Sequence, residues 1–172
     1  MTNAPRLEQL SRPAGPTPDT FRAVIGNFLS GVTVVTTMAD GIPYGTTASA
    51  VTSLCLEPPM VVLCLNQSSA TAAAIGESRR FALNILDEDS ADLAVRFATK
   101  GPDKFAGTDT TPGTTGLPLL SSSLAWLEAE IAETVQAGTH TIFVGKVLGA
   151  EARPGRPLAY FRGGMGRLAV GS

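Results

Sequence analysis

VTVVTTMADGIPYGTTASAVTS, residues 32–53, contains the pattern that decides the fold. Its first run, 32–38, is rich in β-branched residues, which favour strands. Asp40-Gly41 is a dipeptide typical of two-residue hairpin turns, and a second strand-like run occupies 44–53. The stretch therefore predicts two antiparallel strands joined by a tight turn.

Strand-like runs recur along the rest of the chain, and most of them are short and apolar. They occupy residues 60–65, 81–86, 140–151, 157–162 and 166–170. Several of the links between strands suit hairpins, in which neighbouring strands run antiparallel. The pattern predicts a mainly β fold, a small antiparallel barrel with accessory helices.

Helical signals are fewer and fall at 19–28, 69–78 and 87–97. Asp19 is expected to cap the first of these helices, and Ser68 or Ser69 the second. Residues 101–123 are rich in Gly, Pro, Ser and Thr, which predicts a long surface loop. Residues 124–135 fit both helical spacing and strand alternation, and local propensity slightly favours a helix.

Length and composition indicate one domain. The chain has 172 residues, of which 44% are hydrophobic, enough for a buried core. Residues 1–17 are expected to form a flexible N-terminal tail, and 18–172 the single folded domain. With 13 basic and 15 acidic side chains, the net charge of -2 offers no attraction for nucleic acid or for an anionic membrane.

The sequence gives no support for export, for a membrane span or for several classes of chemical site. We find neither a secretory signal nor a run of about 20 apolar residues that could span a membrane, so we expect a cytoplasmic protein. Cys55 and Cys64 lie in apolar stretches and are expected to be buried, reduced thiols, although a disulfide stays open. The sequence has no G-x-G-x-x-G motif after a strand and no P-loop motif, so it predicts neither a Rossmann dinucleotide site nor a P-loop phosphate site. The single histidine, His140, excludes a metal site built from several histidines, and no metal is predicted.

Small polar residues remain as candidates for binding. GTTASAVTS, 45–53, combines hydroxyls and backbone amides with little bulk, so a flat polar ring could lie against it; the pattern alone slightly favours an ordinary close-packed strand. NQSSAT, 66–71, has hydroxyls suited to a phosphate at a helix N-terminus, or to simple capping. Lys104-Phe105 could supply a cation and a stacking face, or belong to a plain loop. His140, at the head of an apolar strand, stands where many histidines are structural.

Five segments in order resemble the flavin reductase domain family, the reductase component of two-component flavin-dependent monooxygenases. They are FRAVIGNFLSGVTVVTT (21–37), GTTASAVTSLCLEPPMVVLCLN (45–66), FALNIL (81–86), AGTHTIFVGKV (137–147) and PLAYFRG (157–163). The resemblance extends from about residue 19 to 168 and implies an FMN-binding split β-barrel, usually a homodimer. It implies that FAD or FMN is reduced by NADH or NADPH and released to a separate monooxygenase. It also implies a strand at 124–135.

The resemblance also implies which residues contact the cofactors. For the isoalloxazine they are Thr46, Thr47, Ala48, Ser49, Ala50, Val51, Thr52 and Ser53; for the ribityl and phosphate groups, Asn66, Ser68, Ser69 and Thr71. Phe97, Lys104 and Phe105 match a region that contacts FAD, and Tyr160 and Arg162 match a closing strand beside the same pocket. His140, the candidate catalytic residue, matches a histidine that meets the nicotinamide.

One position departs from the family pattern. The family commonly has Gly-Asp-His where this chain has Gly138-Thr139-His140, so the group that orients the imidazole is left open. NADH is expected over NADPH because no cluster of basic residues would hold a 2′-phosphate. Two alternatives remain: a flavin-dependent oxidase of the pyridoxamine-phosphate-oxidase kind, and a flavin-binding barrel without catalysis.

Overall fold

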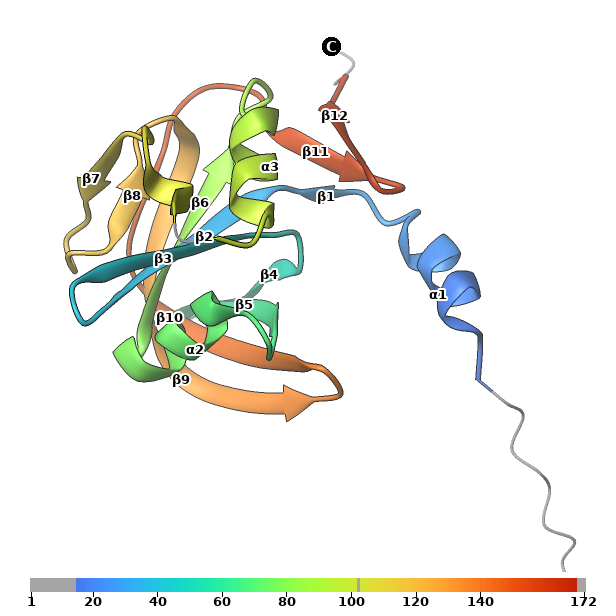
Figure 1. Ribbon diagram of the computed structural model, residues 1–172, viewed down its shortest axis with the longest axis horizontal. Helices are drawn as coiled ribbons and strands as arrows, with labels where there is room; N and C mark the ends of the chain where they lie inside the picture. Colours follow the sequence, from blue (N-terminus) through green and yellow to red (C-terminus); the bar gives the residue numbers. More distant parts are fainter. Residues whose placement is uncertain (1–14, 102, 170–172) are drawn as a thin grey trace, which may run out of the picture.

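The computed structural model describes residues 15–101 and 103–169 (Figure 1). The helices are α1 (Pro18–Ile25), α2 (Ala70–Ser78) and α3 (Ala91–Ala98), with a short 3-10 turn, η1 (Asp103–Phe105). The first strands are β1 (Ser30–Gly31), β2 (Thr33–Ala39), β3 (Ile42–Ala48), β4 (Val51–Leu56), β5 (Pro59–Asn66) and β6 (Arg80–Leu86). The later ones are β7 (Thr110–Pro112), β8 (Pro118–Leu120), β9 (Ser123–Ala137), β10 (His140–Ala152), β11 (Leu158–Phe161) and β12 (Gly164–Arg167).

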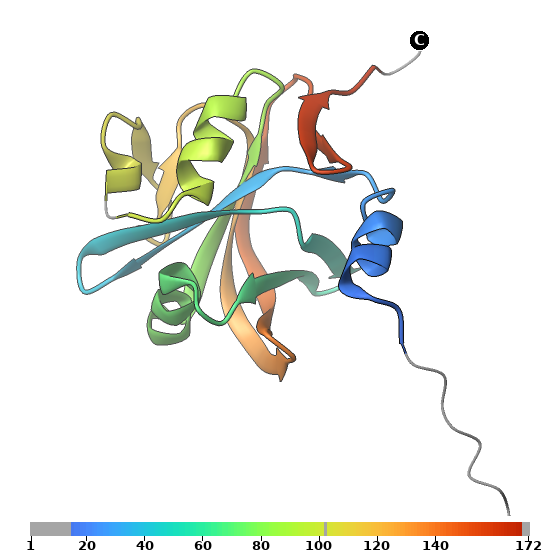
Figure 2. The same ribbon diagram turned by 45° about the vertical axis from the view of Figure 1, so that its right-hand side comes forward.

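A seven-stranded antiparallel sheet forms the body, in the order β3-β2-β6-β9-β10-β5-β4. The sheet curls strongly, but its edge strands β3 and β4 do not pair, so the barrel is split between them (Figures 1 and 2). Two small sheets, β1-β11-β12 and β7-β8, flank the body. The mainly β, split-barrel prediction is confirmed.

The β2–β3 hairpin forms as its turn dipeptide predicts. Ala39 pairs with Ile42, and Asp40 and Gly41 both have positive φ, 50° and 75°. Such values suit a two-residue turn whose twist matches the strands, and Asp and Gly tolerate them well. The second strand-like run, in contrast, is not one strand. It breaks after Ala48, because β3 pairs with β2 whereas β4 pairs with β5 on the other side of the split.

Residues 123–137 form β9, so the local preference for a helix is wrong and the strand implied by the resemblance is right. β9 pairs with β6 on one side and β10 on the other. Those two ladders satisfy the backbone groups that a helix would have satisfied internally. Tertiary pairing thus overrides a weak local propensity.

The expected loop 101–123 is also partly wrong, because it contains η1 and the β7–β8 hairpin. Leu117, Leu119 and Leu120 from this region are buried in the core. A polar clasp fixes the hairpin: the loop between β7 and β8 surrounds the carboxylate of Glu128, a β9 residue with no exposed surface.

Four hydrogen bonds make up this clasp. The backbone N–H groups of Thr114 and Thr115 donate to the two carboxylate oxygens of Glu128 at 2.9 and 3.1 Å. The Thr114 hydroxyl donates at 2.5 Å, and the Thr115 hydroxyl donates to the other oxygen. Burial raises the pKa of Glu128, but these donors outweigh it and hold the pKa below its ordinary value. Gly113 lets the loop approach, since a Cβ there would lie 2.3 Å from the carboxylate.

The helices begin and end somewhat differently from expectation. Thr17, not Asp19, caps α1: its hydroxyl accepts the N–H of Thr20, and the helix ends at Ile25 instead of running to residue 28. Ser69 occupies the cap position of α2, although its side chain makes no capping bond. The third helix starts only at Ala91, because the Asp87 carboxylate is used in the turn before it.

β12 lies at Gly164–Arg167, earlier than the expected 166–170, whose end lies outside the described residues. The expected tail, 1–17, lies mostly outside them as well.

Alternation along β5 and β10 separates the core from the outer face. Val61, Leu63 and Leu65 of β5 and Phe143 of β10 point into the main core cluster. Their neighbours Val62 and Cys64 lie on the opposite face and are half-buried. Both cysteines are free thiols and half-buried, so they are less buried than the sequence predicts.

Candidate functional site

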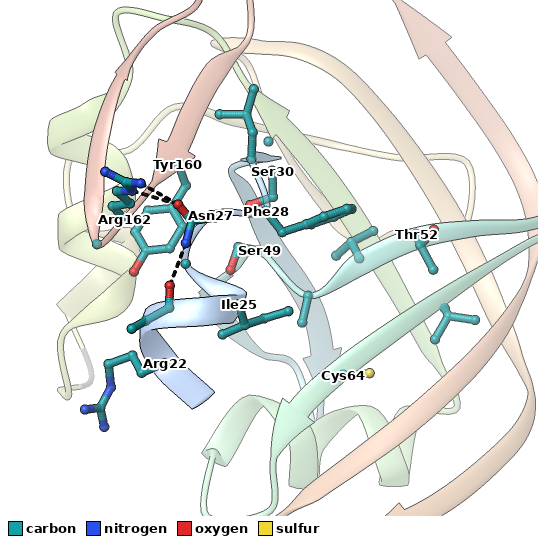
Figure 3. A pocket seen from close by; sticks show the side chains of 18 of the residues that line it. Arg22, Ile25, Asn27, Phe28, Ser30, Ser49, Thr52, Cys64, Tyr160 and Arg162 are labelled. Carbon is teal, nitrogen blue, oxygen red and sulfur yellow. Dashed lines mark hydrogen bonds between the residues drawn. The ribbon is translucent and has the colours of Figure 1, made fainter. Parts of the chain in front are cut away.

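A large open pocket of about 1240 Å³ lies on the outer face of the barrel, beside the split. Its walls come from three parts of the chain: α1 and the segment after it, the β3–β4 link with β4 and β5, and the β11–β12 turn (Figure 3). In Figure 3, Ile25 and Phe28 extend from the α1 side toward the strands that carry Thr52 and Cys64. The pocket thus combines apolar walls with scattered hydroxyls, as sites for flat organic ligands do.

The link between β3 and β4 forms part of one pocket wall. Ser49 and Ala50 lie between the two strands, are exposed, and line the pocket together with Val51 and Thr52. Their side chains are small, so a planar ring can approach the backbone here without a steric clash. These four predicted residues are therefore brought together in one wall.

The remaining predicted residues of β3 and β4 lie elsewhere. The Thr47 hydroxyl donates to the Ala94 carbonyl at 2.6 Å and so joins β3 to α3. Ala48 is buried, whereas Thr46 is half-buried on β3 and Ser53 is exposed on β4. None of these four residues lines the pocket.

The β11–β12 turn forms the opposite rim. Tyr160 and Arg162 line the pocket, as does Gly163. Arg162 has a positive φ of 49°, and its guanidinium donates twice to Asn27 Oδ1, from Nε at 3.0 Å and from Nη2 at 2.6 Å. Asn27 in turn donates to the Ala23 carbonyl near the end of α1, at 2.7 Å. The turn therefore holds the end of α1 in place at the rim.

A second group of predicted residues lies where β5 and β10 meet α2. His140 pairs with Asn66 across the two strands, two residues beyond the pair formed by Ile142 and the pocket residue Cys64. Asn66 Oδ1 accepts the N–H and the hydroxyl of Ser68 at 2.9 and 2.8 Å. His140 and Asn66 thus lie on the face that carries Cys64, beyond the end of the pocket.

The start of α2 adds further polar groups here. Ser69 stands at the helix N-terminus, where the first backbone N–H groups of a helix have no partner within it. Thr71 is buried, however, and is directed into the core side of α2.

Phe97, Lys104 and Phe105 cluster around Gly45, away from the pocket. Phe97 has no exposed surface, and its ring meets that of Phe105 edge to face, with centroids 5.0 Å apart. Lys104 Nζ donates to the Gly45 and Phe97 carbonyls at 3.1 and 3.0 Å, and burial lowers the pKa of this amine. In this arrangement the three residues pack η1 against β3 and α3.

Local sequence reasoning missed the contribution of the α1 region. Arg22, Ile25, Asn27 and Phe28 line the pocket, as does Cys64 of β5. The amphipathic spacing of 21–28 indicates a helix with an apolar face, but it does not show what that face meets.

Among the described residues, no helix is both long enough and apolar enough to cross a membrane.

Comparison with known proteins places this architecture in context. A family model described as "Flavin reductase like domain" matches residues 25–169. The reductase component of a 4-nitrophenol 4-monooxygenase/4-nitrocatechol 2-monooxygenase from Rhodococcus opacus is 52% identical over 148 residues, which cover 86% of this chain and 80% of that protein. A flavin reductase (NADH) from Kitasatospora aureofaciens is 38% identical, with 88% and 82% covered.

The solved structure of a related protein has a similar fold. The NADH:FAD oxidoreductase of Streptomyces globisporus C-1027 superposes with a TM-score of 0.85 at 32% identity, and the match covers 93% of this chain and 99% of that one. The same protein has also been solved in complex with NAD and FAD fragments.

Proposed function

Because this chain belongs to the flavin reductase family, we propose that it oxidises NADH, reduces FAD or FMN, and releases the reduced flavin to a separate monooxygenase. The observation that carries the proposal is the pocket wall at Ser49–Thr52. Its side chains are small, Ser49 and Ala50 are exposed, and the aromatic ring of Tyr160 lines the same pocket. These features fit an isoalloxazine ring.

When bound, a flavin would supply the redox chemistry, with its N5 as the acceptor of the hydride from NADH. The protein has to hold the flavin and nicotinamide rings against each other and exclude other arrangements of the two rings. The backbone N–H groups at Ser49–Val51 are suited to stabilising the negative charge of a reduced ring, since fixed dipoles need no reorganisation. Arg162, at the rim, is suited to an anionic group of the cofactor.

The other half of the site would hold the phosphate and the nicotinamide. Asn66, Ser68 and Ser69 lie at the start of α2, where phosphate groups are favoured. His140 lies beside Asn66 and would hydrogen-bond the nicotinamide carboxamide, so we assign it a binding role and not proton transfer. Phe97 is left out of the proposed contacts because it is fully buried.

The reductase activity is tested by steady-state NADH oxidation with FAD, FMN and riboflavin in parallel. Catalytic turnover with at least one flavin supports the proposal, and the order of kcat/KM identifies the preferred one. NADPH in place of NADH tests the choice of donor. Slow, stoichiometric bleaching of the flavin without turnover would contradict a reductase and favour an oxidase or a binding protein.

The nicotinamide contact has its own test in His140→Ala. The KM for NADH should rise while flavin affinity, measured by fluorescence quenching, is retained. An unchanged KM would remove His140 from the proposed site.

We also propose that the protein is a homodimer. α1 has no buried residue, and an isolated eight-residue helix is not stable in water. α1, β4 and the β11–β12 hairpin lie on one side of the molecule (Figures 1 and 2). Exposed apolar side chains come from these elements and from the segment after α1. This apolar patch comprises Phe21, Val24, Phe28, Leu54, Leu56 and Phe161. A second copy that covers the patch would also shield the pocket beside it.

Val24→Glu tests the dimer, since Val24 is 68% exposed in the single chain and does not line the pocket. Sedimentation should show a dimer for the unmodified protein and a shift toward monomer for the variant. Val95→Glu is the matched control, because Val95 is exposed on α3, outside the patch. A monomer at micromolar concentration, or equal effects of both variants, would contradict this interface. The cytoplasm, where NADH is available, is the proposed location.

A further inference from the structure

The ring of His140 is held by the residue before it. Thr139 Oγ1 lies 2.9 Å from Nδ1 of His140, within hydrogen-bond distance. His140 is the only histidine of the chain. With Nδ1 engaged by the hydroxyl, Nε2 is the ring nitrogen that remains for a ligand.

The backbone around this ring is held by a second residue, Gln67. Its side-chain amide donates to the carbonyls of His140 at 3.2 Å and Gly138 at 3.4 Å. Its own backbone N–H donates to the carbonyl of Thr139 at 3.0 Å. Three consecutive carbonyls of the β9–β10 turn are therefore bound by one residue, which stands between β5 and α2.

This arrangement links the histidine to the rest of the site. Gln67 directly follows Asn66, whose side chain organises Ser68 at the start of α2. The β9–β10 turn is otherwise exposed, since residues 132–140 all have high solvent accessibility. The bonds from Gln67 extend the contact between β5 and β10 beyond their last strand pair, His140 with Asn66, into the turn.

We propose that Thr139 and Gln67 are positioning residues for His140. Gln67 fixes the backbone of the turn, and the Thr139 hydroxyl fixes the orientation of the ring, so that Nε2 faces the nicotinamide. This inference rests on the proposed contact between His140 and the nicotinamide. A hydroxyl is uncharged, so it directs the imidazole without placing a carboxylate beside it.

Enzyme kinetics test the functional part in the full-length protein. Thr139→Val removes the hydroxyl at nearly constant volume and should raise the KM for NADH about 3- to 10-fold, the contribution of one hydrogen bond. The kcat and the flavin affinity should change little, and Thr139→Ser should restore the KM. Gln67→Met, which keeps length but removes the donors, should raise the KM similarly.

Matched controls lie on the same hairpin, β9–β10. Thr134→Val and Gln136→Met change the same residue types on β9, at positions opposite Phe143 and Thr141 and therefore on the other face. Neither control should change the KM for NADH. A rise in the controls equal to that in Thr139→Val and Gln67→Met would overturn the proposal.

Nuclear magnetic resonance provides a readout that needs neither NADH nor turnover. Because the chain has one histidine, labelled imidazole carbon gives a single set of ring signals whose relaxation reports ring motion. The ring order parameter should fall in Thr139→Val and in Gln67→Met, and stay high in Thr139→Ser and both controls. An unchanged order parameter in Thr139→Val would overturn the positioning role.

A double variant separates this inference from the proposed function. When Thr139 acts only through His140, adding Thr139→Val to His140→Ala should raise the KM no further. If His140→Ala alone leaves the KM unchanged, the nicotinamide contact fails, and the inference fails with it. If His140→Ala raises the KM but Thr139→Val does not, only the inference is overturned.

Discussion

Replacing the buried carboxylate of Glu128 should weaken the fold by a predictable amount. Its two oxygens accept four hydrogen bonds from Thr114 and Thr115, two from backbone N–H groups and two from hydroxyls. In Glu128→Gln one oxygen becomes an NH₂ group, which cannot accept from a backbone N–H. About two bonds to a charged group are lost, at about 1.5–3 kcal/mol each, so we expect a loss of at least about 3 kcal/mol.

The measurement is thermal unfolding at fixed protein concentration, because a dimer's melting temperature depends on concentration. For a domain of this size, the loss corresponds to a decrease in Tm of about 6–12 °C. Glu133→Gln is the matched control: Glu133 lies on the same strand but is exposed, so its Tm should stay near that of the unmodified protein. A Glu128→Gln protein that melts within about 2 °C of the control would refute the reasoning.

The pH dependence follows from the direction of the shift. The folded state holds the pKa of Glu128 below its ordinary value of 4.5. The carboxylate therefore contributes its full stability above about pH 4.5, and this contribution is lost as pH falls through the folded pKa. The difference in stability between the unmodified protein and Glu128→Gln should be constant from neutral pH down to that region and shrink below it. A difference that grows on acidification would contradict the assignment.

Three further predictions concern the packing and the pocket. Gly45→Ala should destabilise the protein by about 1–3 kcal/mol in urea unfolding, because the new Cβ would lie 2.6 Å from the Phe97 ring; no loss would contradict this packing. Arg162→Ala, and equally Arg162→Lys, should speed hydrogen exchange in α1, since a lysine cannot reproduce both bonds to Asn27; exchange rescued by lysine would disprove the role of the paired donors. Ala50→Leu should raise the flavin Kd at least about tenfold without lowering Tm, because the exposed side chain would fill the pocket wall; unchanged affinity would place the flavin elsewhere.

Local patterns predicted most elements, and the misses share a cause. The hairpin at Asp40-Gly41 was predictable because a two-residue turn depends on its own dihedral angles. In contrast, β9 and the β7–β8 hairpin depend on distant partners. β9 is a strand because β6 and β10 flank it, and β7–β8 is ordered because its loop surrounds Glu128. Neither partner is visible in the local sequence.

The candidate site divides in the same way. The small-residue run 45–53 was visible as suited to a flat ring and the polar run 66–71 as suited to a phosphate. The lone histidine became a candidate through the family resemblance. The grouping of these residues was not visible, because it depends on β5 pairing with both β4 and β10. The same holds for the α1 region, whose end is held beside the pocket by hydrogen bonds from Arg162 to Gly26 and Asn27.

Residue order alone specifies the strand-rich class, the turn chemistry and, through five ordered segments, the family. These properties are carried by local dihedral preferences and by residue order, which need no knowledge of distant contacts. Tertiary pairing determines where the run 44–53 divides into β3 and β4 and which polar residues share a face. It also decided that a hydroxyl, Thr139, lies against the imidazole of His140. Such features arise from pairing between residues far apart in the chain, and from side-chain geometry that residue order alone does not specify.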